Sequence, residues 1–200
     1  TLSQIPYPGF RFCHQGWITD DRKYLYVDDE LDAPSSGNGN VPRFLARIFD
    51  ITDLANPRMV SVATNGLPSV DHNQYVRGRY LYQSNYTTGL RIWDISNPLV
   101  PVEVAFFDTR PEDDGTGYNG AWGNYPYFAS GTVLISDLER GLFIVRPSLL
   151  ELTQQGTPPA TLNPGQATPV SVQVAAMDAT IGSVSVMVSV TLSPKAAART

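Results

Sequence analysis

The stretch that decides the fold is Arg47-Ile48-Phe49-Asp50-Ile51-Thr52, which returns as Arg91-Ile92-Trp93-Asp94-Ile95-Ser96. Each copy is an apolar strand candidate that ends at Asp and is followed closely by Asn-Pro, so the chain contains a repeated unit. The copies begin 44 positions apart, at residues 47 and 91. That period is typical of four-stranded β-propeller blades rather than of helical arrays.

The sequence around the two copies supports the repeat. His14-Gln15-Gly16-Trp17 precedes Tyr24-Leu25-Tyr26-Val27, and His72-Asn73-Gln74-Tyr75 precedes Tyr80-Leu81-Tyr82. The same order of parts therefore occurs twice.

A third, degraded copy follows. It runs from Asn119-Gly120-Ala121-Trp122 to Gly141-Leu142-Phe143-Ile144-Val145, where Arg146 takes the place of the Asp. Aligning Gly141 with Gly89 gives a spacing of 52 positions, and the excess fits an acidic, Gly-rich insertion at 110–117. Loops absorb such insertions, whereas paired strands do not.

The pattern predicts four short strands in each copy. The predicted strands are 10–18, 22–27, 44–51 and 59–63, then 72–76, 80–85, 90–95 and 102–107, then 120–122, 125–130, 133–136 and 142–145. The polar stretch 28–42 is predicted to be a protruding loop.

Composition limits the function classes. The chain has 200 residues, of which 42% are hydrophobic, with 16 Gly and 16 Pro, and this favours an all-β globular protein. The net charge of -5 and the lack of a Lys/Arg cluster argue against nucleic-acid binding. No apolar run is long enough to span a membrane. The single Cys13 excludes an intrachain disulfide and a multi-cysteine metal site.

A change of composition predicts two domains. Residues 1–152 would form the blades, and residues 153–200 would form an incomplete β-sandwich-like module. In that module, 170–174 and 184–190 alternate between apolar and polar residues, as half-buried antiparallel strands do. A module of so few strands is only marginally stable alone. We therefore expect it to pack on the blades, on another chain or on a further segment of the protein.

Residues 10–147 resemble the LVIVD-repeat β-propellers, and in particular the choice-of-anchor B family. The likeness is carried by Asp71-His72-Asn73-Gln74-Tyr75, by Asp94-Ile95-Ser96 and by Tyr118-Asn119-Gly120-Ala121-Trp122. The resemblance implies an exported bacterial protein, extracellular or on the cell surface, of undefined activity.

Three copies are too few to close a propeller, which typically has four to eight blades. Open strand edges invite aggregation unless another strand pairs with them. We therefore expect these residues to be the C-terminal part of a larger propeller, with the remaining blades on another segment or chain.

The candidate ligand-binding residues lie where each copy begins. His14, His72 and Asn119 are predicted to be equivalent and to face the mouth of a central channel, where they could bind a ligand or a metal ion. The alternative is that each imidazole bonds the backbone of a neighbouring blade and locks the blades together. Trp17 and Trp122, with Tyr75, are predicted to recur at one position, either as core residues or as stacking platforms at the channel mouth.

Asp28, Asp29, Glu30 and Asp32 form the densest group of carboxylates. The group is either a solvated acidic loop, a Ca²⁺ site or a catalytic carboxylate pair. No cofactor is certain from the sequence, calcium is a possible one at this group, and Glu112-Asp113-Asp114 is a weaker candidate for it.

Three other residues are given structural roles. Asp50 and Asp94 are expected to accept backbone N–H bonds in Asx-type turns. Cys13 is expected to be a small buried residue, because no oxyanion hole or orienting group accompanies it.

The leading functional hypothesis is a noncatalytic extracellular propeller that binds a protein or a surface polymer and organises an assembly. The alternative is a metal-assisted hydrolase with His14, His72 and the carboxylates of Asp29 and Glu30 around the channel.

Overall fold

The computed structural model describes residues 1–32, 46–148, 150–155 and 171–176. The chain divides into two compact units, Thr1–Leu149 and Leu150–Thr200, whereas the sequence placed the division after residue 152. Regular structure in the described residues is entirely β, as predicted, and each unit is described by itself.

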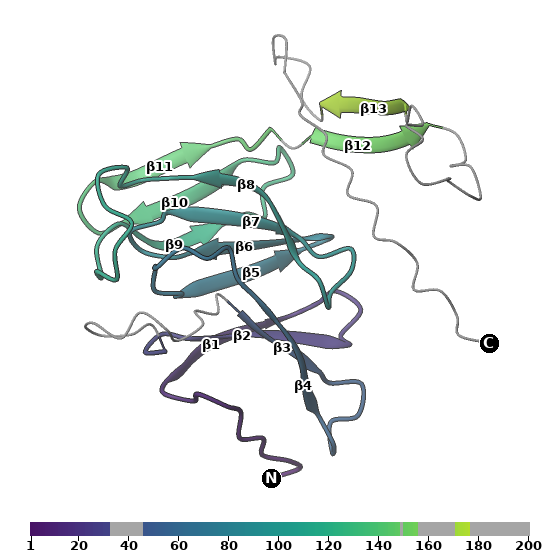
Figure 1. Cartoon of the computed structure of the whole chain (residues 1–200). Coiled ribbons are helices and arrows are strands. Elements are labelled where there is room, and N and C mark those ends of the chain that lie inside the picture. The colour runs from purple at the N-terminus through teal and green to yellow at the C-terminus, as the bar shows by residue number, and fades with distance from the viewer. Residues whose placement is uncertain (33–45, 149, 156–170, 177–200) are drawn as a thin grey trace, which may run out of the picture. The chain divides into compact units, whose positions relative to one another are not determined.

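Three antiparallel sheets make up the first unit (Figure 1). Sheet 1 contains β1 (Cys13–Ile18), β2 (Tyr24–Asp29), β3 (Ala46–Asp50) and β4 (Arg58–Ala63) in chain order. Sheet 2 contains β5 (Asn73–Arg77), β6 (Tyr80–Ser84), β7 (Leu90–Asp94) and β8 (Val102–Phe107) in chain order. Sheet 3 contains β9 (Ala121–Tyr125), β10 (Val133–Asp137) and β11 (Gly141–Val145).

The repeat read from the sequence is present in the strand register. Ile48 pairs with Tyr26, and Ile92, 44 positions later, pairs with Tyr82. Sheet 1 has a register shift between Ile48 and Phe49, and sheet 2 has one at the equivalent place, between Ile92 and Trp93. Sheets 1 and 2 therefore share both strand order and bulge.

The Asp residues that end β3 and β7 act as the sequence predicted. The Thr52 N–H donates to Asp50 Oδ1 over 3.0 Å, and the Ser96 N–H donates to Asp94 Oδ1 over 2.8 Å. The hydrogen bonds from the Thr52 side chain and backbone lower the pKa of Asp50. These carboxylates fix the exit of each strand, as Asx-type turns do.

Sheet 3 differs from the prediction, because its second predicted strand does not form. Tyr125 ends β9, residues 126–130 lie outside the strands, and β10 pairs directly with β9. Pro126 has no N–H to donate to a ladder, which explains why the strand stops there. Gly131, with φ +76°, lies in the turn before β10.

The prediction of a loop at 28–42 is wrong for its first two residues. Asp28 and Asp29 belong to β2 and are 1% and 0% exposed. Buried carboxylates are tolerated in a strand when backbone N–H groups bind them, and both side chains have such donors. The rest of that predicted loop, from residue 33 onward, lies outside the described residues.

Two apolar clusters join the sheets. The first packs Tyr26, Ala46 and Ile48 of sheet 1 on Leu81 and Trp93 of sheet 2. The second packs the opposite face of sheet 2 on sheet 3. Its buried members are Tyr82, Leu90, Ile92, Ala121, Val133 and Ile135. Sheet 2 is therefore covered on both faces.

In the second unit, β12 (Leu150–Gln155) pairs antiparallel with β13 (Ser171–Ala176). β13 overlaps the strand predicted at 170–174, and β12 crosses the predicted domain boundary. The strand predicted at 184–190 lies outside the described residues. The structured part of the chain has no helix with the length and apolar character needed to cross a membrane.

Candidate functional site

The first strands of the three sheets are neighbours, and this arrangement builds the site. β5 contacts β1 on one side and β9 on the other. Tyr86, which follows β6, forms a reciprocal pair of backbone hydrogen bonds with Ala121 of β9, at 3.0 and 2.9 Å. Side chains near the beginnings of β1, β5 and β9 are therefore brought together.

Four aromatic side chains meet there, and we call them the ring cluster: His14, His72, Tyr86 and Trp122. The rings of His14 and His72 stack with centroids 4.5 Å apart and an interplanar angle of 20°. The His72 ring lies 4.6 Å from Tyr86 and 4.4 Å from Trp122. His72 is 2% exposed, whereas Trp122 is 46% exposed. The cluster thus runs from a buried imidazole to a half-exposed indole.

Both histidines bond the backbone of the next sheet. His14 Nδ1 lies 3.0 Å from the His72 carbonyl oxygen, and His72 Nδ1 lies 2.7 Å from that of Trp122. A carbonyl oxygen only accepts, so each Nδ1 carries the proton. Each imidazole therefore bonds the backbone of a neighbouring sheet. Burial lowers the pKa of His72, which favours the neutral ring.

A carboxylate lies beneath the ring cluster. Glu30 Oε1 accepts a hydrogen bond of 2.5 Å from the Tyr86 hydroxyl and lies 3.8 Å from His72 Nε2. Burial and this bond to Glu30 raise the pKa of Tyr86, so its hydroxyl stays protonated and donates. No signal in the sequence singled out Tyr86, whose φ of +46° is rare for a residue with a side chain.

The register changes two predicted equivalences. Trp17 of β1 pairs with Tyr26 of β2, and Tyr75 of β5 pairs with Tyr82 of β6. In sheet 3 the corresponding pair is Tyr125 of β9 with Leu134 of β10. Tyr125 rather than Trp122 therefore matches Trp17 and Tyr75. Three residues before each of these lie His14, His72 and Trp122. Trp122 therefore takes the place predicted for Asn119.

Asn119 does not join the ring cluster. Its side chain donates a hydrogen bond of 2.6 Å to Glu139 Oε1 in an exposed position. The register shift opposite β9, between Ser136 and Asp137, places an additional residue in that strand. The alignment made from sequence alone is displaced by three positions, because Tyr125 and not Trp122 pairs at the place that corresponds to Trp17 and Tyr75.

Trp17 lies apart from the ring cluster, in a second group of aromatic side chains. Its ring contacts Tyr75 at 5.1 Å and Tyr127 at 6.4 Å, and Tyr125 contacts Tyr127 at 5.5 Å. Trp17 is 37% exposed, so the expectation that it is a core residue is wrong. Together these side chains form a half-exposed aromatic surface across all three sheets.

The four carboxylates predicted as a calcium site point to different partners. Asp29 accepts hydrogen bonds from the Tyr7 hydroxyl and from the backbone N–H groups of Arg11 and Phe12. Asp32 pairs with Arg47 at 2.6 Å. Within the described parts of the chain, no three His, Cys, Asp or Glu side chains are arranged to hold a metal ion.

Asp28 is the most perturbed of this group. The Gln15 N–H donates to its Oδ1 over 2.6 Å, while its buried Oδ2 has no hydrogen-bond partner. Burial, with a contribution from the charges of Glu30 and Asp29, raises the pKa of Asp28 to about 8. The sequence missed its neighbour Asp71, which accepts the Asp29 N–H and whose pKa burial also raises. The only sequence signal was its place directly before His72.

The second acidic segment and Cys13 have simpler surroundings. Glu112 pairs with Arg140 at 2.5 Å, and Arg110 pairs with Glu139, so ion pairs hold this loop against the β10–β11 turn. Cys13 is exposed at the start of β1, which corrects the expectation that it is buried.

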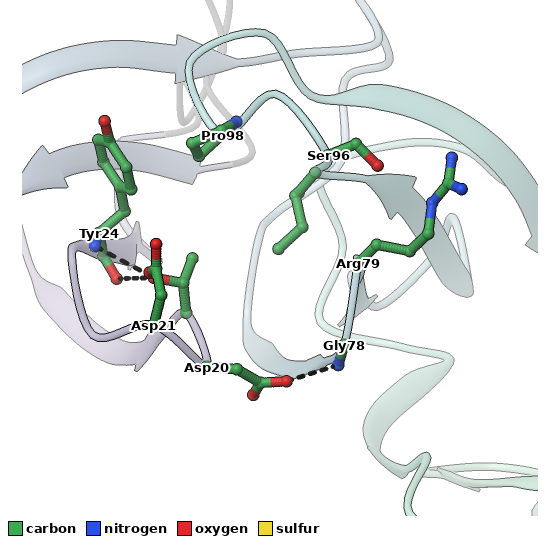
Figure 2. A pocket seen from close by; sticks show the side chains of 9 residues that line it. Asp20, Asp21, Tyr24, Gly78, Arg79, Ser96 and Pro98 are labelled. Carbon is green, nitrogen blue, oxygen red and sulfur yellow. Dashed lines mark hydrogen bonds between the residues drawn. The ribbon is translucent and has the colours of Figure 1, made fainter.

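A shallow hollow of about 320 Å³ lies between sheets 1 and 2, at the opposite end of β1 and β5 from the histidines (Figure 2). Asp20, Asp21 and Arg79 line it, together with the turn residues around Gly78 and Ser96. Asp20 Oδ2 accepts the Gly78 N–H over 3.1 Å and so links the two hairpins. The hollow is open to solvent, its lining includes Tyr24, Ile95 and Pro98 as well as the charged residues, and no buried acid or base lines it.

Several groups of the alternative hydrolase site have partners within the fold. Each histidine uses Nδ1 to hold a neighbouring sheet, which leaves Nε2 as its proton-accepting atom. Asp29 accepts hydrogen bonds from three donors, and Glu30 accepts one from Tyr86. Trp122 remains available as a flat, half-exposed surface.

Comparison with known protein families, with curated proteins and with solved structures finds no match to this chain. The likeness to the LVIVD-repeat propellers stays a prediction carried by the motifs.

Proposed function

We propose that this chain is part of a β-propeller that serves as a noncatalytic binding and assembly module outside the cell or on its surface. The repeated four-stranded sheets, their shared bulge and the adjacent first strands support a propeller arrangement. The location follows from the resemblance of the motifs to exported bacterial proteins.

One observation carries the choice of binding over catalysis. His72, a histidine of the alternative hydrolase site, is 2% exposed and its Nε2 lies 3.8 Å from Glu30, whereas the indole of Trp122 beside it is 46% exposed. A catalytic base must be free to exchange a proton with a substrate. Exposed Trp and Tyr side chains, in contrast, are the usual anchors of binding surfaces.

The partner in this proposal is a protein or a surface polymer. Trp122 would be its principal contact, with the aromatic surface around Trp17 as a second one. Their rings offer large rigid areas that lose little conformational entropy on binding. The hydrolase alternative gains no observation from the geometry.

The proposal is tested with two Trp variants of the full chain. Trp122→Ala removes the indole but keeps the backbone carbonyl that His72 bonds, so the sheets stay locked. We expect at least a tenfold loss of binding to isolated bacterial envelope material and to its purified polysaccharides, and a similar loss for Trp17→Ala. The matched control is Phe106→Ala, because Phe106 is 62% exposed on β8, the last strand of sheet 2.

The proposal fails if both Trp variants bind as the wild type does. It also fails if the wild type hydrolyses a polysaccharide or phosphoester and His72→Gln abolishes the turnover without changing the fold.

A further inference from the structure

The segment that follows β9 connects sheet 3 to both of the other sheets. Residues 126–130 lie outside the strands and carry Tyr127 beside β1 and β5. The Tyr127 ring contacts Trp17 of β1 with centroids 6.4 Å apart, and its hydroxyl donates a hydrogen bond of 2.9 Å to the Val76 carbonyl oxygen of β5. The position of this ring is therefore fixed by the fold.

The aromatic surface around Trp17 consists of five rings that touch in a row. In order of contact they are Tyr75, Trp17, Tyr127, Tyr125 and Phe128. Successive ring centroids lie 5.1, 6.4, 5.5 and 5.1 Å apart. Apart from Tyr75, which is half-buried, the side chains are between 36% and 48% exposed. The row draws on all three sheets and so offers several rings to one extended ligand.

Two charged side chains flank this surface. Asp20 Oδ2 accepts the Gly78 N–H over 3.1 Å, and Arg77 Nη1 donates to the carbonyl oxygen of Pro126, directly before Tyr127, over 2.6 Å. Burial and the charge of Asp20 raise the pKa of Tyr127, as expected for a carboxylate near that ring. Among the described residues, Asp20 Oδ1 and Arg77 Nη2 have no hydrogen-bond partner, so an acceptor and a donor remain for a ligand.

A neutral chain of pyranose sugars matches this combination of groups. One face of a pyranose ring presents C–H groups, which are attracted to the electron-rich face of an aromatic ring. Sugar hydroxyl groups both donate and accept, so they can bond a guanidinium as well as a carboxylate. The charges of Asp20 and Arg77 balance each other, so a polymer with charge of one sign gains little attraction from the pair.

We infer that the aromatic surface binds a neutral polysaccharide chain. Its sugar rings would stack on Trp17 and Tyr125, the two ends of the exposed stretch that contacts Tyr127. Its hydroxyl groups would bond Asp20 and Arg77. Because the fold already holds Tyr127, Asp20 and Arg77 by hydrogen bonds, little further ordering is needed on binding. The inference rests on the proposed binding function and deepens it by naming the class of polymer and the place where it binds.

Calorimetry with defined oligosaccharides tests the inference on the full chain. The probes are cellohexaose, laminarihexaose and chitohexaose, each compared with its disaccharide. We expect saturable binding of at least one hexasaccharide, at least tenfold tighter than binding of its disaccharide, because the longer chain covers more rings of the row.

Three variants locate the binding. Trp17→Ala and Tyr125→Ala each remove one exposed ring and should weaken hexasaccharide binding at least tenfold. Tyr118→Ala is the matched control, because Tyr118 is 49% exposed and Tyr125 is 48% exposed. Tyr118 contacts Tyr86 and lies outside the row, so its variant should bind as the wild type does.

Isolated envelope material separates a sugar from a protein partner. Binding of the full chain should survive protease treatment of that material and should be lost after periodate, which cleaves the vicinal diols of sugars. The inference is overturned if no hexasaccharide binds, if Tyr125→Ala binds as tightly as the wild type, or if protease rather than periodate removes envelope binding. The last result would assign the surface to a protein partner and leave the proposed function intact, since that proposal fails only on the results given for it above.

Discussion

Replacing Ile92 by Ala should destabilise the first unit strongly, and the same replacement at Ile144 should not. The two residues occupy equivalent register positions, so chemistry and strand context are matched. Ile92 is 1% exposed between sheets 2 and 3, whereas Ile144 is 68% exposed. The comparison isolates the energy of contact between the sheets.

The expected magnitude follows from the atoms removed. The Ile-to-Ala change deletes three carbon groups, and at about 0.8 kcal/mol for each buried group the transfer part is about 2.4 kcal/mol. The cavity left between two rigid sheets adds about 1 kcal/mol. We expect Ile92→Ala to lower the free energy of unfolding by about 3.5 kcal/mol and Ile144→Ala to lower it by about 0.5 kcal/mol.

Urea unfolding followed by Trp fluorescence measures the difference. All three Trp residues lie in the first unit, at positions 17, 93 and 122, so the signal reports that unit alone. The urea dependence of the free energy should stay unchanged for both variants. Losses within about 1 kcal/mol of each other would refute the reasoning, because they would mean that the face of sheet 2 is not packed on sheet 3.

Three further predictions also use unfolding followed by Trp fluorescence, in urea for the first two and on heating for the third. Between pH 4 and 8 the folded chain holds a proton on Asp28 that the unfolded chain releases, so stability should fall as pH rises, by at most about 1.4 kcal/mol per pH unit from this group. Asp28→Asn should flatten that slope, and an unchanged pH profile would count against the raised pKa. Gly89→Ala should cost about 3 kcal/mol or more, because its Cβ would lie 2.3 Å from a carbonyl oxygen at the end of β8, whereas Gly66→Ala, with a similar φ and open space, should cost about 1 kcal/mol. Adding Ca²⁺ or a chelator should leave the unfolding midpoint within about 1 °C, since Asp29 and Asp32 are already bound by protein donors, and a rise of several degrees with Ca²⁺ would disprove this.

The sequence predicted the strands that repeat, because apolar alternation and the Asp before Asn-Pro are local signals. The positions of β3 and β7 and the turns at Asp50 and Asp94 depend on neighbours within about five residues. The histidine locks were also predictable, since a repeated polar residue at an inner strand commonly has a packing role.

The errors arose where a distant partner decides the structure. Asp28 and Asp29 look like loop residues until the N–H groups of Arg11, Phe12 and Gln15 are brought to them by the fold. The pairing of Tyr125 with Leu134 depends on the neighbouring strand, so the match of Trp122 with the histidines could not be read from spacing.

Gln15 of sheet 1 and Gln74 of sheet 2 fix the register between these two sheets. The Gln15 amide donates to the Gln74 carbonyl over 2.9 Å and accepts the Gln74 N–H over 3.1 Å. A single side chain thereby imitates one rung of a β-ladder across the boundary between two sheets. Sliding one sheet against the other by a single residue would break both bonds together. Any attempt to graft, duplicate or exchange one of these sheets must therefore keep Gln15, because two register-specific hydrogen bonds join the sheets in addition to apolar packing.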